Sequence, residues 1–193
     1  MHSTSGFGLI LHGDMKLSLQ AYSDSDWASC PTTRRSTTGY VITLDNSPIS
    51  WKSKKQSTVS RSSAEVEYRA MTQAFSEVTW LVRLLADLGV KDLCRVTLNC
   101  DNNLTLHIAQ NSVFHERTKH IDIDCHFRRD KVLEGLLILS HLPTNEQVGD
   151  ILTKILPSHQ HEYIVSKLGL LRSSQSPTCG GVMSTSNATW DPA

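Results

Sequence analysis

The sequence predicts an α/β fold in which helices flank a five-stranded mixed sheet. Two observations support this class. Three strand patterns come first and are separated by polar turns and loops, which is typical of antiparallel hairpins. Helical and strand patterns then alternate, which is typical of parallel strands joined through helices. Ligand sites in such sheets lie at the carboxyl ends of strands, so functional residues are expected there.

Length and charge limit the number of domains and the kind of partner. The chain has 193 residues, 39% of them hydrophobic, which suits one domain with a buried core and some additional length at the ends. Lys and Arg together number 19, as do Asp and Glu, so the formal net charge is zero. Attraction to nucleic acid must therefore come from local basic patches.

Cysteine usage and hydropathy predict a protein that is neither secreted nor associated with a membrane. The five cysteines form no C-x-x-C pair, and an odd number favours reduced thiols over a disulfide framework or a zinc knuckle. No apolar run approaches the length of a membrane span, and the first residues lack the pattern of a secretory signal.

The three N-terminal strands lead to the first candidate acid. Alternating residues predict a strand over 16–24 that ends at Asp24. A second strand over 39–44 and a third over 49–52 are connected by the turn Asp-Asn-Ser-Pro at 45–48. Asp24 is therefore expected at the carboxyl end of a strand.

A long helix follows and carries two candidate acids. Ser62 or Ser63 caps its start, apolar residues recur every three or four positions, and Gly89 ends it. At about 100° per residue, Glu67 falls within the apolar stripe, whereas Glu65 faces away from it toward solvent.

A carboxylate within the apolar stripe is costly unless it is paired or bound to a metal. No Lys or Arg lies one turn from Glu67 on this stripe. Glu67 therefore either reaches water at the rim of the stripe or meets a partner from another element.

The C-terminal half alternates between strands and helices. In chain order we expect a strand over 95–100 followed by Asp101, a short helix over 102–107, a helix over 121–134, a strand over 136–142 and a helix over 144–156. Thr144 and Gln147 form a capping box at the start of the last helix. Ser, Thr, Gly and Pro dominate after residue 172 and predict a disordered tail.

Six motifs occur in order between residues 19 and 157: AYSDSDWASC, RRSTTGY, ISWKSKKQSTVSRSSAEVEYRAM, LNCDNN, RTKHIDIDCHF and HLPTNEQVGDILTK. Together they resemble the ribonuclease H domain at the C-terminal end of copia-type (Pseudoviridae-like) LTR retrotransposon Pol polyproteins. The resemblance implies a ribonuclease H-like domain over 16–157, preceded by a remnant of the reverse transcriptase connection over 1–15. A C-terminal helix or turn and a disordered tail occupy 158–193.

The resemblance also implies four acids that hold two divalent ions. By motif these are Asp24, Glu67, Asp101 and Asp150, and they serve as both metal ligands and catalytic residues. Asp26 remains an alternative to Asp24, which is preferred because it ends the predicted strand. Mg²⁺ or Mn²⁺ takes such hard oxygen ligands, and two ions about 4 Å apart activate water and stabilise the leaving oxygen in phosphodiester hydrolysis.

The implied activity is hydrolysis of the RNA strand of RNA/DNA hybrids by a metal-dependent endonuclease during reverse transcription. The implied partners are the hybrid and the adjoining reverse transcriptase domain, in a cytoplasmic virus-like particle or in the nucleus. Ser29, Gly149 and the pair Leu104–Thr105 depart from the family pattern. These departures keep open a catalytically weak or inactive remnant that only binds nucleic acid, whereas the four retained acids favour the enzyme. A third reading, a 3′ exonuclease of the same superfold, is disfavoured by the motifs.

Nucleic-acid contacts are predicted mainly in the segment 51–61, which combines basic and hydroxyl side chains before the long helix. Its alternative is a solvated loop whose hydroxyls cap the helix. The residues expected at the nucleic acid are Lys52, Lys54, Lys55, Ser60, Arg61 and Asn102.

Histidines provide two further candidates. One histidine candidate is an alternating set of possible zinc ligands, His120, Asp122, Asp124 and His126. On a helix these residues form two pairs on different faces, so they do not converge on one ion. A packed helix is therefore preferred there. His141, in the fifth predicted strand, is a weak match to the auxiliary loop histidine of related cellular enzymes.

Overall fold

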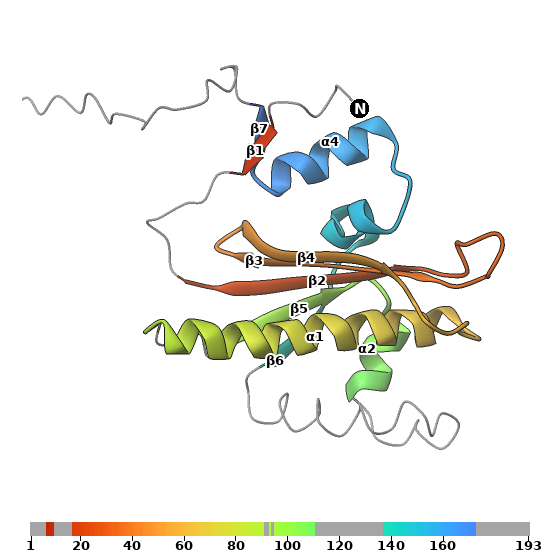
Figure 1. Ribbon diagram of the computed structural model, residues 1–193, viewed down its shortest axis with the longest axis horizontal. Coiled ribbons are helices and arrows are strands. Elements are labelled where there is room, and N and C mark those ends of the chain that lie inside the picture. Colours follow the sequence, from red (N-terminus) through yellow and green to blue (C-terminus); the bar gives the residue numbers. More distant parts are fainter. Residues whose placement is uncertain (1–6, 10–16, 91–92, 94, 111–136, 173–193) are drawn as a thin grey trace, which may run out of the picture.

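The central element is a five-stranded mixed sheet with the order β4-β3-β2-β5-β6 (Figure 1). The computed structural model describes residues 7–9, 17–90, 93, 95–110 and 137–172. β2 pairs antiparallel with β3 and parallel with β5, β3 pairs antiparallel with β4, and β5 pairs parallel with β6. The strands are β2 (Leu19–Asp26), β3 (Thr37–Leu44), β4 (Ser47–Lys55), β5 (Val96–Cys100) and β6 (Leu137–His141). The predicted fold class is confirmed.

β3 and β4 are longer than their sequence patterns indicate, and β2 begins and ends later than predicted. Asp45 and Asn46 form the turn between β3 and β4 with φ angles of 47° and 65°, the left-handed pair that a tight hairpin turn requires. The prediction that the first strand ends at Asp24 is wrong. Pairing continues to Asp26, because β3 offers Thr38 and Thr37 as further partners.

Helix α1 (Ser63–Asp87) covers one face of the sheet, as Figure 1 shows. Its N-cap is Ser62, whose hydroxyl accepts a hydrogen bond from the backbone N–H of Glu65, and Gly89 follows its end with a φ of 86°. Apolar side chains of α1, including Met71 and Phe75, form the main core with the inward residues of β2, β3, β5 and β6. The shorter helix α2 (Asn103–Gln110) packs beside α1.

The opposite face carries short elements from the C-terminal part of the chain (Figure 1). They are the 3₁₀ helices η2 (Thr144–Glu146) and η3 (Val148–Leu152), then α4 (Ser158–Lys167) and β7 (Leu170–Arg172), which pairs with β1 (Phe7–Leu9). α4 begins beyond the domain boundary expected at residue 157. Its Ile164 nevertheless packs in a second core with Tyr22 and Val41 of the sheet.

The predicted helix over 144–156 and its capping box are wrong. Two short 3₁₀ helices stand in its place, and Pro143 caps the first without a side-chain hydrogen bond. Gln147 is fully buried, and its amide donates to the carbonyl oxygen of Ser23 on β2 while its side-chain oxygen accepts from the N–H of Gly149. Gln147 therefore caps η3 and also anchors it to β2, in place of the capping box expected at Thr144.

Three predictions fall outside the described residues: the helix over 121–134, the alternating segment from His120 to His126, and the tail after residue 172. Within the described ranges, no helix is both long enough and apolar enough to cross a bilayer.

Candidate metal centre

Asp24 lies in β2 opposite Gly39 of β3, beneath the 3₁₀ helix η3. Its side chain is fully buried. Thr153 donates a hydrogen bond to Oδ2, and the ammonium of Lys154 lies 3.1 Å from Oδ1. Asp24 is therefore held by the turn after η3, not by a strand end.

Two glycines allow η3 to approach Asp24 this closely. A Cβ on Gly39 would lie 2.6 Å from Cγ2 of Thr153 and 2.9 Å from Cβ of Leu152. A Cβ on Gly149 would lie 3.0 Å from Cβ of Asp24. Gly149, noted in the sequence as a departure from the family pattern, thus lies against the candidate ligand.

Asp150 lies in η3, and Asp101 directly follows β5, as predicted. Carboxylate oxygens of Asp24, Asp101 and Asp150 all lie within 4.8 Å of one another. Lys154 Nζ is 2.8 Å from Oδ1 of Asp150. Burial raises the pKa of Asp150 to about 6, with the negative charge of Asp24 adding to the shift and Lys154 opposing it.

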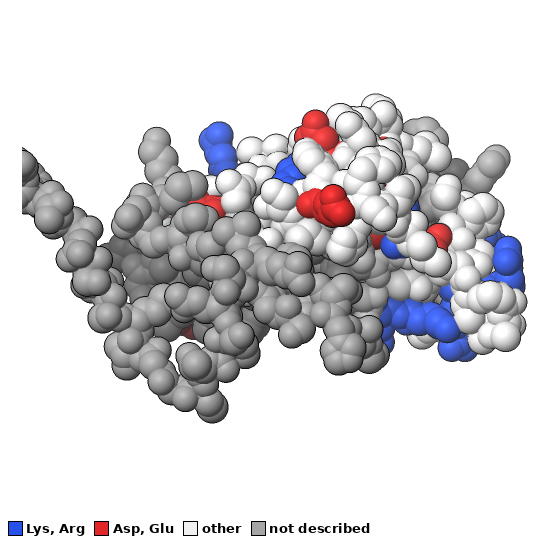
Figure 2. Space-filling view, turned by 90° about the horizontal axis from the view of Figure 1, so that it is seen from above, with Lys and Arg blue, Asp and Glu red and all other residues white. Residues whose placement is uncertain are grey.

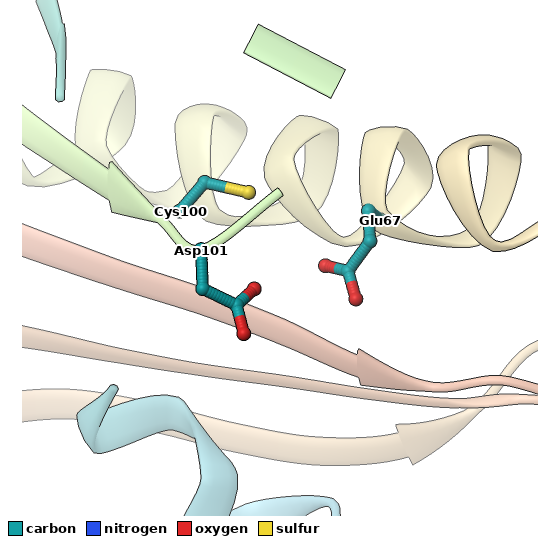
Figure 3. Close-up of side chains that lie close together, drawn as sticks. All are labelled: Glu67, Cys100 and Asp101. Carbon is teal, nitrogen blue, oxygen red and sulfur yellow. The ribbon is translucent and has the colours of Figure 1, made fainter. Parts of the chain in front are cut away.

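Glu67 reaches the same place from α1, on the other face of the sheet. Figure 3 shows its carboxylate and that of Asp101 directed into a common space, and ligand atoms of Glu67, Cys100 and Asp101 lie within 4.8 Å of one another. Glu67 is 7% exposed, and its buried Oε2 has no hydrogen-bond partner. The structure confirms the burial that the helical wheel predicts.

Desolvation is the main cause of a raised pKa at Glu67, which reaches about 8. The negative charges of Asp24 and Asp101 raise it further, while Ser25 and Lys154 act in the opposite direction. A divalent cation beside the unpartnered Oε2 would reverse this penalty, and a carboxyl group in this condition fits such an ion.

Glu65 faces away from this centre and forms an ion pair with Arg69 at 2.7 Å. Its side chain is only 11% exposed, so it is less solvated than predicted because Arg69 lies against it. Asp26 lies two residues beyond Asp24, outside both groups of converging acids found among the described residues.

Cys100 is a member of the centre that the sequence did not indicate. It is fully buried at the end of β5, and burial raises the pKa of its thiol to about 12. A neutral thiol is a poor ligand for Mg²⁺, which prefers oxygen, so the carboxylates define the chemistry of the site.

All four acids proposed from the sequence therefore come together. Asp101 is common to both groups of three and joins the Glu67 side to the Asp24 and Asp150 side. An oxygen-rich, largely buried cluster of this kind suits Mg²⁺ or Mn²⁺. Thr153 and Lys154 complete the centre, and the only sequence signal for Lys154 is its position four residues after Asp150.

The residues expected at nucleic acid lie in different settings. Lys52, Lys54 and Lys55 are exposed on the edge strand β4, and Arg61 is exposed just before α1. Figure 2 shows Lys and Arg gathered at one end of the visible face, where the β2–β3 and β4–α1 connections lie in Figure 1. Arg34 and Arg35, in the β2–β3 connection, are also exposed and were not predicted as contacts.

Two predicted contact residues are already engaged. Ser60 is buried, and its hydroxyl donates to Oε1 of Gln56. The side chain of Asn102 accepts a hydrogen bond from the N–H of Thr105, which caps α2. His141 is exposed at the end of β6, beside Cys100 in register.

Comparison with solved structures defines the class of the fold. The N-terminal RNase H domain of a Mycobacterium tuberculosis protein, solved as a maltose-binding-protein fusion, matches 78% of this chain and 98% of its own, with a TM-score of 0.51 and 11% identity. LC11-RNase H1 in complex with RNA/DNA hybrid matches 70% of this chain and 93% of its own, with a TM-score of 0.51 and 17% identity. The chain has a ribonuclease H-like fold.

Sequence relatives define the family more narrowly. The Pol polyproteins of transposons RE2 and RE1 of Arabidopsis thaliana are 41% and 43% identical over 93% and 88% of the chain. That of transposon TNT 1-94 of Nicotiana tabacum is 35% identical over 88%. No family model matches. The homologues of this chain over most of its length are therefore retrovirus-related Pol polyproteins of retrotransposons, and the chain spans 12% to 13% of the length of these relatives.

Proposed function

We propose that this chain is the ribonuclease H domain of a copia-type Pol polyprotein, a divalent-metal-dependent endonuclease that hydrolyses the RNA strand of RNA/DNA hybrids during reverse transcription. One observation carries the proposal. Four carboxylates from β2, α1, the end of β5 and η3 converge around Asp101. Elements this far apart in sequence bring four acids together at a real desolvation cost, which a pair of divalent ions offsets.

Each acid has a distinct part in this proposal. Glu67 and Asp101 would hold one ion, and Asp24, Asp101 and Asp150 would hold the other. When bound, two Mg²⁺ or Mn²⁺ ions would activate a water and stabilise the leaving 3′ oxygen. Without metal at neutral pH, Glu67 keeps its proton because its pKa is about 8, so it must release that proton to become a ligand.

The substrate is proposed from the basic end of the molecule and from the family. Exposed Lys52, Lys54, Lys55 and Arg61 provide phosphate contacts, while 2′-hydroxyls and the shape of the groove distinguish a hybrid from duplex DNA. The solved LC11-RNase H1 binds an RNA/DNA hybrid, which is consistent with this substrate class. The adjoining reverse transcriptase, connected through residues 1–15, is the proposed partner, and a cytoplasmic virus-like particle or the nucleus is the proposed location.

A cleavage assay tests the proposal directly. Labelled RNA/DNA hybrid, duplex RNA and duplex DNA are incubated with the chain in Mg²⁺ or Mn²⁺. We expect only the RNA of the hybrid to be cut. Removal of a residue that only supports a metal ligand typically lowers activity by roughly 10- to 100-fold. Asp24→Asn removes a proposed ligand, so its cleavage activity should fall by more than this. Asp26→Asn is the matched control in the same strand and should cleave as the unmodified chain does.

A second candidate, a module that binds the hybrid without cutting it, rests on one contact. Lys154 pairs with both Asp24 and Asp150, so part of the negative charge of the acidic centre is balanced without a metal ion. Retention of hybrid in a filter-binding assay, with no cleavage in either metal, would support this candidate and reject the enzyme.

A further inference from the structure

The ammonium of Lys154 lies between two of the candidate metal ligands. It is 3.1 Å from Oδ1 of Asp24 and 2.8 Å from Oδ1 of Asp150. These two carboxylates are almost completely buried, whereas the Lys154 side chain is 32% exposed. One flexible cation therefore compensates two fixed anions from the solvent side.

The backbone around Lys154 is fixed relative to the same acids. The N–H groups of Thr153 and Lys154 both donate to the carbonyl oxygen of Asp150, at 3.1 and 2.9 Å. The Thr153 hydroxyl donates to Oδ2 of Asp24, the oxygen that Lys154 does not contact. Only the side chain of Lys154 is free to leave, since its backbone is held.

The Glu67 side of the centre has no such cation. Oε2 of Glu67 is buried without a hydrogen-bond partner, and no Lys or Arg in the described part of the chain forms an ion pair with Glu67 or Asp101. The two halves of one acidic cluster thus differ in how their charge is balanced.

We infer that Lys154 is an internal counter-ion that occupies the cation position between Asp24 and Asp150 and must be displaced before a divalent ion binds there. An ammonium and a divalent cation within a few ångströms repel each other strongly, and the carboxylates of Asp24 and Asp150 attract both. The metal-free centre is preorganised by Lys154, and the Glu67 half fills at lower metal concentration than the Asp24 and Asp150 half. This inference rests on the proposed metal site.

Calorimetric titration of the 193-residue chain with Mn²⁺ provides the first test. Lys154→Met removes the competing charge, and the weaker of two binding events should become about tenfold tighter. Lys154→Arg keeps the charge and should bind within a factor of a few of the unmodified chain. Lys167→Met, which removes the cation paired with Glu146 away from the centre, is the matched control and should leave both events unchanged.

Thermal unfolding supplies a second readout that does not depend on activity. In EDTA, Lys154→Met should melt below the unmodified chain, because Asp24 and Asp150 are left without a counter-ion. Saturating Mn²⁺ should remove that difference, so the metal-induced rise in Tm is larger in the variant. Lys154→Gln repeats both measurements if the Met variant does not fold.

The outcomes separate this inference from the function on which it rests. Equal or weaker Mn²⁺ binding by the neutral variants, when the unmodified chain binds two ions, overturns the role of Lys154 and leaves the metal site standing. An absence of Mn²⁺ binding in the unmodified chain and in both neutral variants overturns the metal site itself, and the role of Lys154 with it. Binding of the second ion only after Lys154 is neutralised supports the inference in its strongest form.

Discussion

The two faces of the central sheet contribute to the acidic centre by different physical means. On the α1 face, Glu67 is carried by a regular helix into an apolar core, and desolvation raises its pKa to about 8. On the η3 face, Asp24 and Asp150 are both paired with Lys154 and held by close backbone contacts. One face keeps its acid protonated, whereas the other keeps its acids ion-paired.

This difference shows that a cluster of acids can be tolerated without metal in two ways at once. Protonation removes the charge of Glu67, and the ammonium of Lys154 offsets part of the charge of Asp24 and Asp150 on the other face. Under the proposed metal site, a divalent ion would displace a proton from Glu67 on one face and the ammonium of Lys154 on the other. The two faces should respond differently to mutation, pH and salt.

The largest effect is expected where η3 meets the sheet. In Gly39→Val, a Cβ 2.6 Å from Cγ2 of Thr153 and 2.9 Å from Cβ of Leu152 forces η3 outward. The free energy of unfolding should fall by about 3 kcal/mol, the upper part of the range for overpacking. The Mn²⁺-induced rise in Tm should also be lost, because Asp150 and Lys154 move with η3.

Gly8→Ala is the control for Gly39, since a Cβ on Gly8 meets nothing within 4 Å. Denaturant unfolding with and without Mn²⁺ measures both effects. A Gly39→Val protein with normal stability and normal metal response would show that the η3 face does not depend on this close approach.

The next effect is a pH dependence that belongs to the α1 face. The pKa of Glu67 is about 8 in the folded chain against 4.5 as its ordinary value, so the folded state binds a proton that the unfolded state has lost between these pH values. Without metal, stability should therefore fall as pH rises through this window, by about 1.4 kcal/mol per pH unit. Glu67→Gln should abolish this contribution, because the amide does not titrate.

Urea unfolding in EDTA between pH 6 and 8 measures the slope for Glu67. Asp150, whose pKa is raised to about 6, contributes mainly below this range, so the two faces are separated by the choice of pH. Glu65 lies two residues before Glu67 on the same helix and is paired with Arg69. The variant Glu65→Gln should therefore retain the slope. A Glu67→Gln protein with the original slope would refute the desolvation of Glu67.

The α1 face could be predicted from sequence because its information is local. The apolar period of α1 alone places Glu67 inside and Glu65 outside, and alternation in β5 places Asp101 after a strand. Both positions follow from residues close together in the chain. The fold class, which depends on the order of such patterns, was predicted for the same reason.

The η3 face could not be predicted because its contacts are between residues distant in sequence. Gln147 bonds to Ser23 across 124 positions, and Lys154 bonds to Asp24 across 130. These tertiary bonds replace the capping box expected from Thr144 and Gln147, and the predicted helix becomes two 3₁₀ turns. Ser60 shows the same limit, since its burial beside Gln56 is set by packing and not by the polar sequence around it.

The smallest expected effect is on the binding of nucleic acid, and it tests which side of β4 contacts the hybrid. Lys52 of β4 pairs with Tyr40, a residue of the core beneath α1, so Lys52 faces the α1 side. Lys54 lies two residues further along the strand and therefore faces the same side. Lys55 faces the opposite side, where its ammonium donates to Sγ of Cys30 at 3.0 Å. Among the described residues, Lys54 has no ion pair, so its charge is available to a phosphate.

Lys54→Ala should weaken hybrid binding severalfold and reduce the slope of log K against log salt by about 1, as loss of one phosphate contact does. Lys55→Ala should have a smaller effect because its ammonium is engaged with Cys30. Fluorescence anisotropy of a labelled hybrid across a salt series, in EDTA to prevent cleavage, measures both slopes. If Lys55→Ala changes the slope and Lys54→Ala does not, the hybrid lies on the η3 side of β4, the side that carries Lys154.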